Sequence, residues 1–192
     1  MKRVMCIVSA IGLAATVGVA AQRGGGQGGQ KIGLATSLQR GYAGFKGNFT
    51  GNAEKMPEAD YNFKPGSMPE VRPYGALFMH IANAQYAQCA AVKGVPNPNQ
   101  GVDLEKTKTT KADIVKELAD SFAFCDDAFS STTDENAVQF VKQGNNEAMR
   151  AVVLYGVLTH GNEMFGTSNV YLRAKGLVPA STERMMGRGR GN

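Results

Sequence analysis

The sequence predicts an all-α fold, a bundle of four amphipathic helices. Apolar residues recur three and four positions apart in four separate stretches, which is the spacing of one face of an α-helix. Neither an internal repeat nor a strand-like alternation of useful length is present in the sequence. With 192 residues and 43% hydrophobic content, the chain is long enough for one such domain with its own core.

The first residues differ from the rest of the chain. Lys2 and Arg3 precede an apolar run from Val4 to Val19, which is followed by small residues. This arrangement predicts a signal peptide at residues 1–21, because the run is short for a transmembrane helix. We therefore expect an exported protein, periplasmic or secreted, with no membrane segment after cleavage. Residues 22–31 are rich in Gly and Gln and predict a disordered leader.

The helical domain is expected to span residues 32–180. Its first helix should run from Ile32 to about Met56, although several glycines weaken it by about 1 kcal/mol each relative to alanine. The second helix begins at Pro73, a favoured first helical residue, and stops before Gly94. The third helix, Lys111 to Ser130, has one apolar face: Ile114, Leu118, Phe122, Cys125 and Phe129.

The last helix is predicted from about Asn145 to Lys175. Residues 135–143 predict only a short helical turn before it, and the Gly- and Arg-rich residues 181–192 predict a disordered tail. One side of the last helix carries a continuous row of residues at helical spacing: Met149, Val153, Gly156, His160, Met164, Thr167 and Tyr171.

The chain has only two histidines, His80 and His160, and both lie on apolar helix faces. From the residues alone, two readings stay open: core histidines that bond to each other or to a water, and ligands of a metal ion. Nucleic acid is not expected as a partner. Loss of Lys2 and Arg3 with the signal lowers the net charge from +5 to +3, and no cluster of cations with interleaved aromatic residues is present.

Two motifs resemble the DinB/YfiT-like family. The first reads Asp60-Tyr-Asn-Phe-Lys-Pro, followed by Pro69-Glu-Val-Arg-Pro-Tyr-Gly-Ala-Leu-Phe-Met-His80. The second reads His160-Gly-Asn-Glu-Met164-Phe-Gly, followed by Tyr171-Leu-Arg-Ala-Lys-Gly-Leu-Val-Pro. The family pattern has a histidine where this chain has Met164.

The resemblance implies a DinB-like four-helix bundle that holds a divalent ion, zinc or nickel, with three histidines. Carried over by position, His80 and His160 match two ligands and Met164 replaces the third. A thioether is a soft ligand, so the replacement favours Cu(I). Glu163, one residue earlier, is a substitute oxygen donor.

We therefore expect a DinB-like bundle with a degenerate metal pocket and no competent enzyme activity. Two alternatives remain: a divalent-metal-dependent enzyme of the thiol-transferase or hydrolase type, which the resemblance implies, and a module that binds a soft metal or a small-molecule ligand. The resemblance also implies a homodimer.

Two cysteines, Cys89 and Cys125, remain after signal cleavage. In an oxidising compartment they form either a disulfide between the second and third helices or two buried free thiols.

Overall fold

The computed structural model describes residue 29 and residues 31–189. The predicted signal peptide, nearly all of the predicted leader and residues 190–192 lie outside this range. Within the described range, no helix combines the length and the apolar character needed to cross a membrane.

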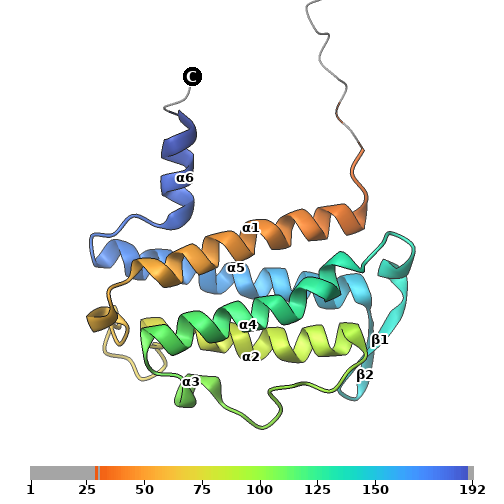
Figure 1. The fold of residues 1–192 in the computed structure, drawn as a ribbon, viewed down its shortest axis with the longest axis horizontal. Helices are drawn as coiled ribbons and strands as arrows, with labels where there is room; N and C mark the ends of the chain where they lie inside the picture. The colour runs from red at the N-terminus through yellow and green to blue at the C-terminus, as the bar shows by residue number, and fades with distance from the viewer. Residues whose placement is uncertain (1–28, 30, 190–192) are drawn as a thin grey trace, which may run out of the picture. The chain divides into compact units, whose positions relative to one another are not determined.

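Four long helices form the bundle: α1 (Leu34–Lys55), α2 (Tyr74–Lys93), α4 (Lys111–Ser130) and α5 (Arg150–Ala174). Helices α1 and α2 each pack against both α4 and α5 (Figure 1). The predicted all-α bundle is therefore confirmed, and the first three long helices begin and end close to the predicted residues.

An aromatic core holds these helices together. Phe45 of α1 meets Phe122 of α4 edge to face, with ring centroids 5.4 Å apart, and Phe49 contacts Phe78 of α2 at 4.6 Å. The Phe45 ring also fills the space that a side chain at Gly161 of α5 would need, because a Cβ there would overlap it. This glycine lets α1 approach α5 directly beside the predicted site residue His160.

A disulfide joins Cys89 of α2 to Cys125 of α4, with Cα atoms 5.3 Å apart, and both residues are fully buried. Of the two states that the sequence leaves open, the structure therefore has the bridge. It fixes the packing of α2 against α4 from within the core.

The segment before α5 differs from the prediction. A 3₁₀ turn, η2 (Asn136–Val138), is followed by an antiparallel hairpin of β1 (Phe140–Gln143) and β2 (Asn146–Met149). The predicted helix start at Asn145 was therefore wrong, and so was the absence of strands.

The loop of the hairpin explains this difference. Gly144 has φ 61°, and a Gly-X pair favours a two-residue hairpin loop over a helix. Because α5 begins only at Arg150, Met149 is 39% exposed and does not belong to the buried face of that helix.

The C-terminal segment also differs. We expected residues 181–192 to be disordered, but residues up to 189 form the helix α6 (Ala180–Gly189). The buried backbone N–H of Ala180 donates to Oδ1 of Asn52 in α1, at 3.0 Å, and Glu183 in the first turn pairs with Lys55. The Gly and Arg content suggested disorder, whereas contacts with α1 order the start of this helix.

Candidate functional site

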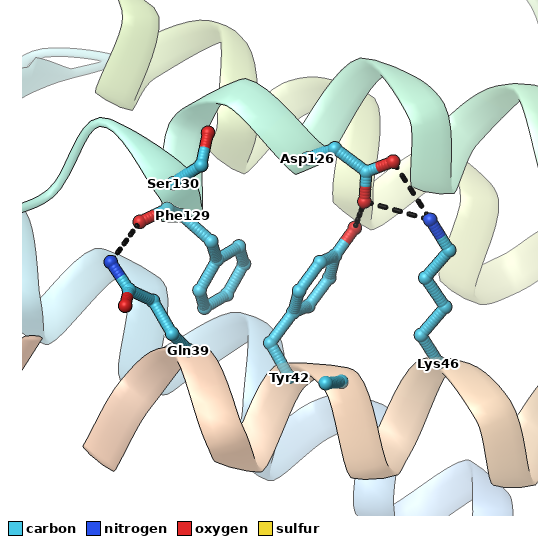
Figure 2. A pocket seen from close by; sticks show the side chains of 7 residues that line it. Gln39, Tyr42, Lys46, Asp126, Phe129 and Ser130 are labelled. Carbon is cyan, nitrogen blue, oxygen red and sulfur yellow. Dashed lines mark hydrogen bonds and ion pairs between the residues drawn. The ribbon is translucent and has the colours of Figure 1, made fainter. Parts of the chain in front are cut away.

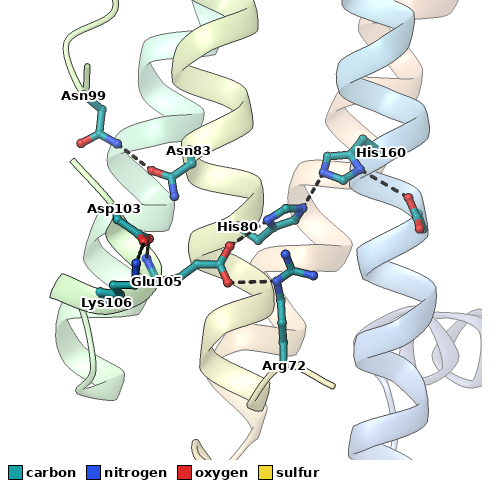
Figure 3. A network of polar contacts seen from close by, with 9 residues as sticks. Arg72, His80, Asn83, Asn99, Asp103, Glu105, Lys106 and His160 are labelled. Carbon is teal, nitrogen blue, oxygen red and sulfur yellow. Dashed lines mark hydrogen bonds and ion pairs between the residues drawn. The ribbon is translucent and has the colours of Figure 1, made fainter. Parts of the chain in front are cut away.

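The two histidines face each other between α2 and α5 (Figure 3). The Nε2 atoms of His80 and His160 are 3.0 Å apart, and the ring planes are inclined by 70°. Both side chains are partly buried, with 26% and 33% of their surface exposed. The structure thus brings together two residues that are 80 positions apart in the chain.

Glu105 binds the other side of His80. Its Oε1 is 2.8 Å from Nδ1 of His80, and its Oε2 accepts a hydrogen bond from Nε of Arg72 at 2.9 Å (Figure 3). One carboxylate therefore bridges the imidazole and a guanidinium. Sequence reasoning missed both Glu105 and the role of the Arg72 side chain.

A one-turn helix, α3 (Leu104–Thr107), places Glu105 beside α2. The Asp103 carboxylate caps this turn by accepting from the backbone N–H of Glu105, and Leu104 is 2% exposed in the core. An Asp before an apolar residue is a readable start signal for a helix. The contact with His80 has no such signal, because it depends on the path of the α2–α4 connection.

Tyr171 holds the backbone next to this cluster. Its hydroxyl donates to the carbonyl oxygen of Arg72 at 2.8 Å. Burial raises the pKa of Tyr171 above its ordinary value, so the phenol stays protonated at neutral pH. Arg72 of the first motif and Tyr171 of the second motif are therefore in contact, and Arg72 also binds the carboxylate that contacts His80.

The second nitrogen of His160 faces Glu163. The distance from Nδ1 to Oε2 is 3.3 Å, and the Glu163 side chain is 66% exposed. This distance is long for a charge-assisted hydrogen bond. Glu163, which we considered as a substitute donor, thus lies on the Nδ1 side of the ring and not on the Nε2 side that faces His80.

Met164 is 9% exposed and belongs to the hydrophobic core. Across the described part of the chain, no group of three or more His, Cys, Asp or Glu side chains converges as a set of metal ligands. The donors that come together at this site are therefore two imidazole nitrogens.

The hydrogen bonds indicate which nitrogens are free. An ionised carboxylate only accepts, so the 2.8 Å contact with Glu105 assigns a proton to Nδ1 of His80 and leaves its Nε2 as an acceptor. Nε2 of His160 lies 3.0 Å from this acceptor, the distance of an N–H···N hydrogen bond. Either a proton on Nε2 of His160 or a metal cation held by both nitrogens accounts for this approach.

The separation of the two nitrogens fits a shared metal ion. A Zn–N bond is about 2.0–2.1 Å long and zinc sites are tetrahedral, so two such ligands lie about 3.3–3.4 Å apart. The observed 3.0 Å is slightly shorter, so the rings would move a little apart around the ion. The two imidazoles are therefore close to the spacing of two ligands of one cation.

A groove between α1 and α4 contains a second group of polar contacts (Figure 2). Lys46 pairs with both oxygens of Asp126, at 2.8 and 2.7 Å, and the Tyr42 hydroxyl bonds Oδ1 of Asp126 at 3.0 Å. Burial raises the pKa of Tyr42 above its ordinary value, so its hydroxyl remains a donor. Because these groups satisfy one another, we interpret the cluster as a structural link between two helices.

Comparison with known proteins agrees with the fold. A family model described as the DinB superfamily matches residues 47–162, more than half of the chain, and this range includes both histidines but not Met164. None of the curated proteins matches the sequence.

Several solved structures are similar, and two of them are DinB-like proteins. One is a DinB-like protein from Bacillus cereus ATCC 10987, with a TM-score of 0.62 and 14% identity over 74% of this chain and 93% of that chain. The other is a DinB-like protein from Bacillus subtilis, with a TM-score of 0.56 and 15% identity over 73% of this chain and 92% of that chain. At this identity the likeness shows the fold.

Proposed function

Because this chain belongs to the DinB superfamily, we propose that it is an exported, non-catalytic member whose two facing histidines bind one metal cation weakly. Nε2 of His80 and Nε2 of His160 would hold the ion, and Glu105 would orient His80 through its Nδ1. The observation that carries this proposal is the 3.0 Å approach of two nitrogens whose ring partners are carboxylates.

The donor set argues against a catalytic centre. A catalytic zinc site normally has three protein ligands and one open position, at which the metal acts as a Lewis acid or activates water. Here Met164 lies in the core and Glu163 lies on the far side of the His160 ring. Two imidazoles alone would bind zinc or nickel weakly and would tolerate Cu(I).

Metal analysis of the purified mature protein tests this proposal. We expect less than one equivalent of bound metal, weak binding of added zinc or nickel in calorimetry, and no binding after His80→Ala or His160→Ala. Met164→His should strengthen binding by supplying a third imidazole, and Met68→His, at a 63% exposed position, should not. One tightly held zinc or nickel per wild-type chain would overturn the proposal.

A metal-dependent transferase or hydrolase is the second candidate. The Glu105–His80 contact favours it, because a carboxylate on the second nitrogen is the usual companion of a histidine that ligates a metal. Turnover of thiol-transfer or ester substrates by the metal-loaded protein, lost in His80→Ala, would establish this function.

The disulfide supports export. Structural disulfides persist in oxidising compartments, and Cys89 and Cys125 are bridged. Cell fractionation followed by N-terminal sequencing should find the protein outside the cytoplasm, beginning at Gln22. A cytoplasmic protein that retains Met1 would exclude this part of the proposal.

A further inference from the structure

The β1–β2 hairpin approaches the end of α2 (Figure 1). A large pocket lies between them. Its volume is about 930 Å³, within the usual range for a small-molecule site. The last turns of α2, the loop after it, the hairpin and the first residue of α5 form its walls. Along α5, at 1.5 Å per residue, Arg150 is about 15 Å from His160, so the pocket is separate from the histidine pair.

The charged residues that line this pocket are all cationic: Lys93, Lys142 and Arg150. Lys93 is already engaged, because its ammonium donates to the backbone oxygen of Phe124 and lies 3.7 Å from Asp127. Among the residues described, neither Lys142 nor Arg150 forms an ion pair. Two cations without an ion pair therefore share one concave surface, although Glu147 lies opposite Lys142 in the hairpin.

The Arg150 side chain, which lines the pocket, has an unsatisfied donor. Its Nε is buried and has no hydrogen-bond partner among the residues that the structure describes. A buried donor without a partner is unfavourable, and the Arg150 guanidinium would have to turn toward an acceptor in the pocket for that acceptor to satisfy Nε.

The local backbone adds to this positive potential. Arg150 begins α5, whose N-terminus has no side-chain cap and no acidic residue in its first turn. The partial positive charge of a helix N-terminus favours an anion there. At the end of α2, by contrast, the N–H groups of Gly94 and Val95 already bind terminal carbonyls, which reduces the opposing negative potential.

We propose that this pocket binds a small polar anion through a carboxylate or phosphate group. Arg150 and Lys142 contact the anionic group, and the side chains of Asn97 and Gln100, which also line the pocket, are available to hydrogen-bond the polar body. The inference does not depend on metal binding, because none of these residues takes part in the histidine cluster.

Three probes with the same polar body test the proposal: glucose 6-phosphate, glucuronate and glucose. Calorimetry at low ionic strength should detect binding of at least one of the two anions and none of glucose, and added salt should weaken it. In amide NMR spectra, the probes should shift the signals of Ala91, Val95 and Lys142. Binding of only one anion identifies the anionic group and supports the proposal.

Charge-removing variants provide the decisive comparison. Arg150→Gln and Lys142→Gln should each weaken binding about tenfold or more, the usual effect of losing a hydrogen bond to a charged group. Lys64→Gln, an exposed cation outside the pocket, is the matched control and should bind as the wild type does. If Arg150→Gln fails to fold, the exposed Lys142 position still decides the question.

Four outcomes would overturn the proposal: neither anion binds, glucose binds as tightly as the anions, the Lys64 variant loses as much affinity as the Lys142 variant, or the NMR shifts fall outside the pocket.

Discussion

The hydroxyl of Tyr171, near the end of α5, donates a 2.8 Å hydrogen bond to the backbone carbonyl of Arg72, just ahead of α2. Arg72 in turn binds Glu105, which faces His80. Helix α5 therefore contributes twice to the site: it supplies His160 directly and supports His80 from the other side.

Replacing Tyr171 with Phe should lower the free energy of unfolding by about 0.5–1.5 kcal/mol, because the Arg72 carbonyl loses its donor. Urea denaturation measures the change. Tyr155→Phe is the matched control on the same helix, at a 61% exposed position, and should have no effect. Equal effects of the two variants would mean that the hydrogen bond adds nothing to stability.

Replacing Glu105 with Gln should weaken metal binding about 10–100-fold, because the charged partner that orients His80 is lost. Calorimetric titration of the wild type and the variant with the same metal gives the ratio. Glu70→Gln, at an exposed position near the same motif, should leave the affinity unchanged. Unaltered affinity in Glu105→Gln would show that this carboxylate does not support a metal ligand.

Two glycines of α5 should respond to alanine with opposite signs. At Gly161 the new Cβ would overlap the Phe45 ring, which should cost about 1–3 kcal/mol of stability. At Gly166 no atom lies within 4 Å of the new Cβ, so the higher helix propensity should stabilise the protein by up to about 1 kcal/mol. Thermal unfolding measures both changes. A Gly161→Ala variant that is as stable as the wild type would contradict the close contact of α1 and α5.

Thiol titration tests the disulfide. The mature chain, unfolded in guanidinium without reductant, should show no reactive thiol and should show two after reduction. Replacing both Cys89 and Cys125 with Ala should lower stability by roughly 3–4 kcal/mol, the loop-closure value for a sequence separation of 36. Two reactive thiols before reduction would show that the bridge is not formed in the protein.

The helical bundle was predictable because each long helix has a continuous apolar face, as in α4, whose observed bounds match the prediction. The hairpin before α5 was missed although the Gly144-Asn145 loop is a local signal in the sequence. The apparent helical row through Met149 was given more weight than that turn.

The other differences between prediction and structure come from contacts between residues far apart in the chain. The spacing of residues along the sequence does not predict such contacts. Glu105 reaches His80 only because the connection between α2 and α4 folds back along α2. Helix α6 depends on Asn52, which is 128 positions before Ala180. The two histidines were identified because they are the only ones in the chain, but their partners required the folded backbone.

The buried amide of Asn52 joins three helices. Its nitrogen donates to Ser168 and Asn169 of α5, at 2.8 Å each, and its oxygen accepts from the N–H of Ala180. Removing the chain from residue 180 onward would leave the buried Asn52 oxygen without a hydrogen-bond donor. The resulting loss of stability would affect the contact between α1 and α5, which the same amide joins. An affinity tag or fusion partner should therefore be attached after α6 rather than in its place.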